Sequence, residues 1–299
     1  MPEPDDRKRT GSVEAFDSSW RERSESQYNH WTSGPVRNQI QLAFRSHWEV
    51  FSELIGNRPP GNVLEVGCGR GSLSSYFADS GWEATLLDSS PEAIETARKV
   101  FATNRHKAQF VVGDALDLPF EDGCFDVVAS IGLLEHFEEL RMPIDEQWRM
   151  LKPGGWLLCY IVPERPDNLQ RHFNWINGVL KAAIGRFGAE KTSSPKPFLF
   201  RSDAGSESYI PHLKPHAPAK IVVTGMYSMP MISHSPEFPF TLLPAPLERV
   251  LVALFKTALW TRRILTGKHG WLCKERNGQA FLVAAQRGHL EGEYQHVGS

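Results

Sequence analysis

Three glycines recur within one short segment, Glu65-Val66-Gly67-Cys68-Gly69-Arg70-Gly71, at the end of an apolar run. Glycine lets the backbone take positive φ and approach a ligand closely. The helix predicted to follow offers unpaired N–H groups at its start, which suits a polar small molecule. A dinucleotide fits poorly, because the third glycine comes one residue early for the pattern G-x-G-x-x-G counted from Gly67.

The elements that must position this turn alternate between strands and helices. Apolar runs predict strands at 63–66, 84–88, 109–112, 125–130, 156–162, 220–226 and 279–286. Spacing of three or four residues predicts helices at 36–55, 72–79, 91–101, 143–151, 168–186 and 247–264. We therefore expect an α/β fold: a Rossmann-like, seven-stranded, mostly parallel sheet with helices on both faces. In such a sheet, ligands bind at the carboxyl ends of the strands.

The glycine segment also carries a family resemblance. Val63 to Gly71, VLEVGCGRG, resembles the first motif of the class I S-adenosylmethionine-dependent methyltransferases. The resemblance continues in order through four more segments, at 87–90, 112–115, 118–128 and 151–155. It covers about a third of the chain and is closest to the small-molecule branch that includes ubiquinone and menaquinone methyltransferases. It implies an enzyme that uses S-adenosylmethionine and serves small-molecule methylation in biosynthesis.

The resemblance assigns cofactor contacts to residues at the strand ends. Asp88 offers two oxygens to the two ribose hydroxyls, although it is also placed to cap the next helix. Asp114 would accept from the adenine amino group, although an Asx turn would explain it equally. Glu65 would orient the glycine loop or accept from the amino group of the methionine part. The implied cofactor set is Glu65, Gly67, Cys68, Gly69, Asp88, Ser89, Asp114, Ala115, Ser130 and Ile131.

His136 follows the fourth predicted strand, where the resemblance places the start of the acceptor site. An imidazole titrates near neutral pH and suits a general base; the alternative is a histidine that only braces its loop. Some ubiquinone O-methyltransferases carry a further carboxylate three positions before the glutamate that corresponds to Glu135. This chain has Gly132 at that position. We therefore expect no metal, and we assign Glu138 and Glu139 to a solvated face.

The segments outside the resemblance are expected to form a cap. In family members, the N-terminal helical region and the insert after strand five close over the cofactor. The candidate substrate-binding residues from these segments are Tyr28, Trp31, Arg37, Trp175 and Tyr209. About ten of the 21 prolines fall between Pro195 and Pro246, and six of the nine tryptophans lie outside 61–165, which places proline and aromatic stiffening in this cap.

The helix predicted at 247–264 has two interpretations. Its apolar stripe, which includes Leu247, Val250 and Leu254, favours docking on the sheet with a solvated basic face. The cations Arg249, Lys256 and Arg263 recur every seven residues, and a basic amphipathic helix can also lie on a membrane surface. Peripheral membrane contact therefore stays open.

Composition limits the remaining classes. The 299 residues carry a formal net charge of −2, which argues against a nucleic-acid partner recognised by bulk charge. The four cysteines form no C-x-x-C pair, so neither a zinc cluster nor a disulfide scaffold is indicated. The polar start lacks a secretory pattern, and the apolar runs fall short of the ~20 residues of a membrane span. We expect a cytoplasmic protein of unassigned oligomeric state.

These observations predict one domain and a ranked set of functions. We expect a tail at 1–27, a methyltransferase domain at 28–290 and a tail at 291–299. Within the domain, we expect a helical cap at 28–60, the cofactor core at 61–163, a lid insert at 164–220 and C-terminal strands and a helix at 221–290. The favoured activity is O- or C-methylation of a small, largely apolar or aromatic acceptor. Alternatives are a lipid-like or quinone acceptor at the membrane surface, and a non-catalytic adenosyl-binding partner protein.

Overall fold

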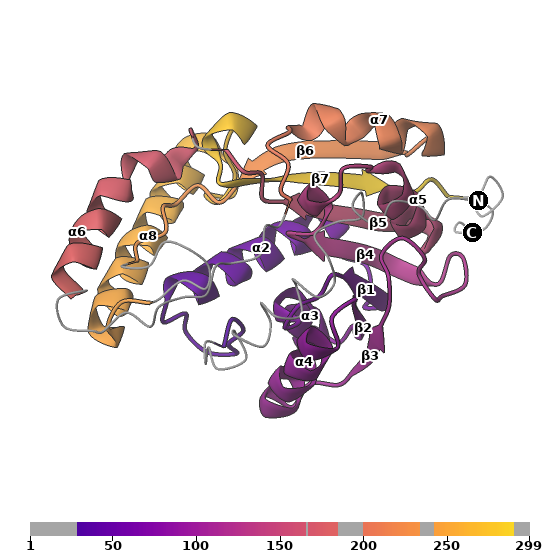
Figure 1. Cartoon of the computed structure of the whole chain (residues 1–299), viewed down its shortest axis with the longest axis horizontal. Helices are drawn as coiled ribbons and strands as arrows, with labels where there is room; N and C mark the ends of the chain where they lie inside the picture. The colour runs from indigo at the N-terminus through magenta and orange to yellow at the C-terminus, as the bar shows by residue number, and fades with distance from the viewer. Residues whose placement is uncertain (1–28, 166, 185–199, 234–241, 290–299) are drawn as a thin grey trace, which may run out of the picture.

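A seven-stranded sheet organises the computed structural model, which describes residues 29–165, 167–184, 200–233 and 242–289 (Figure 1). The strand order is β3-β2-β1-β4-β5-β7-β6, and β7 alone runs antiparallel to its neighbours. The strands are β1 (Asn62–Val66), β2 (Glu83–Asp88), β3 (Ala108–Val112), β4 (Phe125–Ile131), β5 (Leu151–Ile161), β6 (Lys220–Met226) and β7 (Ala280–Gln286). The predicted fold class is confirmed.

Helices cover both faces of the sheet. The described helices are α2 (Gln39–Ile55), α3 (Ser72–Asp79), α4 (Pro91–Asn104), α5 (Arg141–Arg149), α6 (Asn174–Ile184), α7 (Ile210–Leu213) and α8 (Ala245–Thr266). One apolar core joins the sheet to α2, α3 and α4, and the other joins it to α5 and α7 (Figure 1). Because both faces are buried, the central strands are apolar at successive positions: Val63 and Leu64 are each fully buried.

Local capping explains where two of these helices begin. The Ser90 hydroxyl accepts from the backbone N–H of Ala93 at 3.1 Å, and Pro91 occupies the first turn of α4. The Asn38 side chain accepts from Gln41 N–H at 2.9 Å, so α2 begins at Gln39, three residues after its predicted start. Helix α2 then ends at Gly56, whose φ of 74° breaks the helix as the sequence predicts.

Two predicted boundaries are wrong because of contacts distant in sequence. The strand predicted at 156–162 begins earlier, because β5 includes residues 151–155 and Leu151 already pairs with Phe125 before the register shifts at Val127. The helix predicted at 168–186 is divided: a 3-10 turn spans Leu169–His172, and α6 begins at Asn174. The Gln170 side chain is bonded to the backbone of Met231, and its amide also donates to Asn174 at the start of α6.

Helix α8 packs against the core through Phe255, Ala258 and Leu259, and only the N-terminal part of the predicted stripe faces outward. Its buried residues are Glu248 and Val252, whereas Leu247, Val250 and Leu254 are exposed. The Glu248 carboxylate accepts from the backbone N–H and the side-chain amide of Gln39, at 3.0 and 2.8 Å. A buried carboxylate requires such partners, so this contact with α2 turns the N-terminal part of the apolar stripe outward.

Candidate functional site

The carboxyl ends of β1, β2 and β4 meet at the glycine turn. Gly67 and Gly71 take φ values of 67° and 69°, which side chains rarely adopt. A Cβ on Gly67 would lie 2.8 Å from Leu133 Cδ1, and one on Gly71 would collide with Leu86 and Phe101. The turn therefore needs glycine both for its conformation and for its close packing under the start of α3.

Two buried carboxylates hold this turn in place. Asp88 ends β2 and accepts from the backbone N–H of Gly69 at 2.8 Å and of Ser90 at 2.9 Å, one bond on each oxygen. Glu65 accepts from the N–H and the hydroxyl of Ser74, at 2.9 and 2.5 Å, on one of its oxygens. Asp88 thus links the glycine turn to α4, and Glu65 links β1 to the first turn of α3.

Burial sets the ionisation of this cluster. It raises the pKa of Glu65 to about 7, against the opposing effect of the Ser74 hydrogen bonds. Burial, with the nearby Asp88 and Glu65 charges, also raises the pKa of the Cys68 thiol well above its usual range. Cys68 is therefore a neutral thiol at neutral pH, and a thiolate nucleophile is excluded there.

The loop after β3 carries the next pair of predicted cofactor residues. Asp114 is exposed, and its carboxylate accepts from Leu116 N–H at 2.9 Å, as in an Asx turn. Ala115 beside it is buried. The remaining predicted cofactor positions also lie at strand ends: half-buried Ser89 follows β2, and Ser130 and Ile131 end β4.

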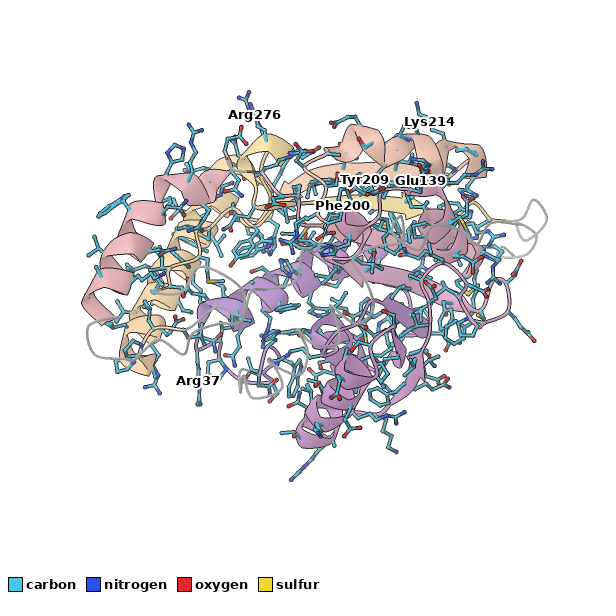
Figure 2. All side chains as sticks on the ribbon, in the orientation of Figure 1. Arg37, Glu139, Phe200, Tyr209, Lys214 and Arg276 are labelled. Carbon is cyan, nitrogen blue, oxygen red and sulfur yellow. The ribbon has the colours of Figure 1, made fainter. Side chains whose placement is uncertain are left out.

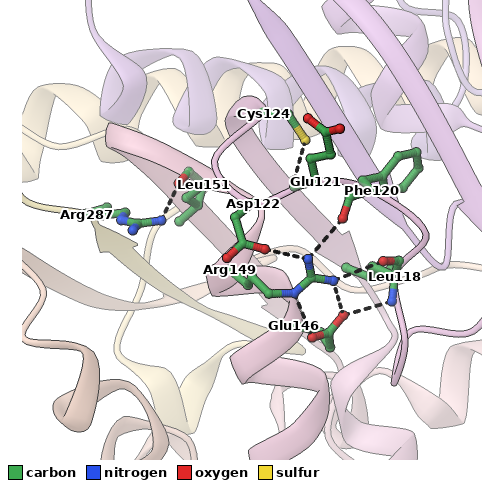
Figure 3. Close-up of polar contacts among 9 residues, drawn as sticks. All are labelled: Leu118, Phe120, Glu121, Asp122, Cys124, Glu146, Arg149, Leu151 and Arg287. Atoms are coloured by element: carbon green, nitrogen blue, oxygen red, sulfur yellow. Dashed lines mark hydrogen bonds and ion pairs between the residues drawn. The ribbon is translucent and has the colours of Figure 1, made fainter.

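A charged clamp from α5 holds this loop (Figure 3). The Arg149 guanidinium donates to the carbonyls of Leu118 and Phe120, both at 3.0 Å, and pairs with Asp122 and Glu146, both at 2.7 Å. Glu146 in turn accepts from Leu118 N–H at 2.9 Å. The Arg149 hydrogen bond holds the pKa of Glu146 below its usual range. The clamp fixes the loop on which Asp114 and Ala115 stand.

His136 is buried in a short 3-10 turn after β4, and its Nδ1 lies 2.6 Å from the carbonyl oxygen of Phe200. A carbonyl can only accept, so Nδ1 carries the proton in this contact. The neighbouring Glu135 carboxylate accepts from Val162 N–H at 3.3 Å, and burial raises its pKa to about 7. These contacts join the end of β4 to the segment that resumes at residue 200.

The structure does not gather the predicted acceptor residues. Arg37 and Trp175 are exposed, the latter to 69%, and Arg37 projects away from the body (Figure 2). Trp31 packs against His106 with ring centroids 4.4 Å apart. Tyr209 is buried against Phe281 in the core that faces α5 and α7. Tyr28 lies outside the described residues.

His30 is a site residue that sequence reasoning missed. Its Nδ1 lies 2.7 Å from the hydroxyl of Ser72, the first residue of α3, and its ring stacks on Phe44 of α2 at 4.9 Å. Burial, followed by the Arg70 charge, lowers its pKa to about 3, so the ring is neutral. Its position beside Trp31, in the segment expected to close over the cofactor, is the one signal the sequence offered.

A metal site and a membrane-spanning helix are both absent from the residues that the structure describes. Among them, no group of three or more His, Cys, Asp or Glu side chains is arranged to hold a metal ion. Within the same ranges, no helix combines the length and apolar character needed to cross a membrane.

Comparison with known proteins identifies the core. Residues 64–159 match the family model described as a methyltransferase domain. The norajmaline N-methyltransferase of Rauvolfia serpentina is 35% identical over 102 residues, which are 33% of this chain and 35% of that protein. The 2-methyl-6-phytyl-1,4-hydroquinone methyltransferase of Synechocystis is 32% identical over 148 residues, 49% of this chain and 46% of its own.

These sequence matches span less than half of either relative. The structure of magnesium protoporphyrin IX methyltransferase from Synechocystis, solved with bound SAH, extends the likeness in fold. It covers 92% of this chain and 97% of its own with a TM-score of 0.50, at 18% identity. The shared fold therefore includes the C-terminal strands, beyond the segment matched in sequence.

Proposed function

We propose that this chain, whose residues 64–159 form a class I S-adenosylmethionine-dependent methyltransferase domain, methylates a small, largely apolar or aromatic acceptor. The observation that carries the proposal is the fixed Asp88 carboxylate at the carboxyl end of β2, next to the glycine turn. The names of relatives that act on a hydroquinone and on norajmaline support a small-molecule acceptor. We favour oxygen or carbon as the atom methylated.

The residues at the strand ends fit S-adenosylmethionine by their donor and acceptor capacity. The Asp88 carboxylate, held by Gly69 and Ser90 at the end of β2, is placed to accept from the hydroxyls of a ribose. The glycine turn brings bare backbone to the position of the methionine part, under the start of α3. Glu65 orients this turn through Ser74, and Asp114 is the acceptor for an adenine amino group.

The chemical step is an in-line displacement in which the protein mainly orients the acceptor and excludes water. When bound, S-adenosylmethionine supplies a methyl group on an already activated sulfonium. We propose His136 as the general base for a hydroxyl or an acidic carbon of the acceptor. A proton on Nδ1, directed at the Phe200 carbonyl, is the tautomer in which an imidazole can take up a proton at Nε2.

Titration calorimetry with S-adenosylmethionine tests the cofactor site. We expect wild type to bind, and Asp88→Ala to weaken binding at least ~10-fold, because two ribose hydroxyls lose their acceptor. Glu83→Ala is the matched control, since Glu83 is an exposed acid at the opposite end of β2 and should leave affinity unchanged. Absence of binding by wild type would refute the proposal.

A lipid-like acceptor at a membrane surface is the second candidate, and the exposed faces of α6 and α8 favour it. Trp175 and Val179 on α6 are exposed, and α8 exposes a larger apolar set: Leu247, Val250, Leu254, Trp260, Ile264 and Leu265. The cations Arg249, Lys256 and Arg263 are exposed as well, whereas the acid of α8, Glu248, is buried. Apolar surface flanked by cations complements an anionic bilayer.

Co-sedimentation with lipid vesicles tests this candidate. We expect binding to vesicles that contain phosphatidylglycerol and weak binding to phosphatidylcholine alone. Leu254→Glu should abolish the binding, because it puts a charge into the apolar face. Met142→Glu changes an equally exposed apolar residue on α5 and should leave it intact. Equal binding by both variants, or none by wild type, would contradict membrane docking.

A further inference from the structure

Three aromatic side chains from separate parts of the chain, and Phe44 of the same helix, surround His47 of α2. Its ring centroid lies 4.4 Å from that of Tyr160, 5.6 Å from that of Trp271 and 6.3 Å from that of Tyr227. Tyr227 and Trp271 stack on each other at 4.7 Å. The fourth neighbour, Phe44, lies edge-on at 5.5 Å. We call His47, Tyr160, Tyr227 and Trp271 the aromatic cluster.

The polar atoms of the aromatic cluster are buried and unsatisfied. Within the part of the chain that the structure describes, both ring nitrogens of His47, the hydroxyl of Tyr227 and the indole N–H of Trp271 have no hydrogen-bond partner. His47 is only 3% exposed. Leaving one such group unpaired costs about 1–3 kcal/mol, so four in one cluster point to a polar ligand that satisfies them.

Backbone strain provides an independent observation at the same place. Tyr227 has a φ of 62°, in the left-handed region that bulky residues rarely adopt. Such a conformation persists only where the surroundings enforce it, and strained residues gather at ligand-binding sites. Its carbonyl accepts from the N–H of Gln279, at 3.3 Å, which anchors it beside the start of β7.

The aromatic cluster lies at the carboxyl ends of β5 and β6, in the same sheet that carries the cofactor site. Tyr160 is next to last in β5 and pairs in register with Ile131, the last residue of β4. Tyr227 directly follows β6, which runs parallel to β5 because both are antiparallel to β7. Helix α2 brings His47 over the same strand ends. An acceptor held here would therefore be next to the end of β4, where the methyl group is to be delivered.

The electrostatics favour an uncharged ligand. Burial alone lowers the pKa of His47 to about 3, so its ring is neutral, with one donor and one acceptor nitrogen. Burial, and then the Glu248 charge, raise the pKa of Tyr227, which keeps its hydroxyl protonated. An anionic acceptor would meet the Glu248 carboxylate and would lose its hydration on burial. A neutral ring with hydroxyl groups matches both the stacking surfaces and the hydrogen-bonding groups.

We infer that the aromatic cluster is the acceptor subsite, and that it binds a neutral hydroxylated aromatic ring through His47, Tyr227 and Trp271. The inference rests on the proposed methyltransferase function and specifies its acceptor class. In this arrangement the two nitrogens of His47 and the Tyr227 hydroxyl bond the ring hydroxyls, while Tyr160 and Trp271 supply aromatic walls.

The test uses the full chain saturated with SAH and methylhydroquinone, kept reduced, as the probe in titration calorimetry. We expect wild type to bind the probe, and His47→Phe to weaken binding at least ~10-fold, because two hydrogen-bonding atoms are lost while the ring is kept. Tyr227→Phe removes a single oxygen and should weaken binding ~3–10-fold. Affinity for SAH should stay within about twofold of wild type in both variants.

His106→Phe is the matched control, since His106 also has a buried unpartnered ring nitrogen among aromatic rings, but just beyond the end of α4. It should leave probe affinity unchanged. Should His47→Phe lose SAH binding through misfolding, Tyr227→Phe decides the outcome. SAH bound by wild type with no affinity for the probe, or with affinity unchanged in Tyr227→Phe, overturns the inference while the cofactor site stands. Failure of wild type to bind SAH would instead refute the proposed function.

Discussion

Asp88 and Glu65 are both buried carboxylates at the glycine turn, yet their contacts differ. Asp88 accepts from two backbone N–H groups, one on each oxygen, and so holds the glycine turn to the start of α4. Glu65 accepts both the N–H and the hydroxyl of Ser74 on one oxygen, and burial raises its pKa to about 7. The first residue is suited to hold the cofactor, and the second to hold α3 against β1.

The raised pKa of Glu65 predicts a pH-dependent stability. A carboxyl whose pKa rises on folding favours the native state at low pH and loses that contribution as pH rises through about 7. Glu65→Gln keeps the acceptor for Ser74 but does not titrate. The melting temperature of the variant relative to wild type should therefore be higher at about pH 8 than at about pH 5. A difference independent of pH would contradict the assigned ionisation.

His136 predicts a separation of binding from turnover. His136→Ala should leave the affinity for S-adenosylmethionine near that of wild type, while lowering kcat by roughly 10²-fold for an acceptor whose proton must be removed. Paired calorimetry and SAH-release assays measure the two quantities. An unchanged kcat would return His136 to the bracing role that its bond to Phe200 also allows.

At the scale of elements, α5 stabilises the loop after β3 through Arg149. Arg149→Met keeps most of the apolar stem but leaves two carbonyls and two carboxylates without their donor. We expect the free energy of unfolding to fall by about 1–3 kcal/mol in denaturant titration. Arg141→Met, which removes an exposed pair with Asp145 on the same helix, should cost less than about 0.5 kcal/mol. Equal losses would contradict the clamp.

How well the sequence predicts an element depends on whether the cause is local. The predicted helix at 72–79 and the predicted strand at 220–226 are confirmed at both ends. Glycines flank the helix, and the extent of the apolar run sets the limits of the strand. The orientation of α8 depends on Gln39, more than two hundred residues away, and no local pattern encodes that bond. The sequence does not predict the aromatic cluster for the same reason. Its members are distant in sequence, and each one taken singly resembles an ordinary core residue: His47, Tyr160, Tyr227 and Trp271.

At the scale of the molecule, the sheet and its cap are one interlocked body. Strands β6 and β7 complete the sheet after the whole insert has passed. Residues 231–233 are bonded by side-chain amides from three elements, through Gln39, Gln170 and Asn177. Because the N-terminal helix, the insert and α8 share this anchor, we expect the acceptor site to depend on all of them, whereas the cofactor turn depends on residues 64–159.

Methyl transfer from S-adenosylmethionine to an acceptor can be measured directly by following its products. The protein is incubated with S-adenosylmethionine deuterated in its methyl group and with methylhydroquinone or a metabolite extract, and products are followed by mass spectrometry. We predict SAH and an acceptor carrying the deuterated methyl in equal amounts, both lost in Asp88→Ala. Tight cofactor binding with neither product formed would contradict the proposed methyltransferase activity and identify a non-catalytic adenosyl-binding protein.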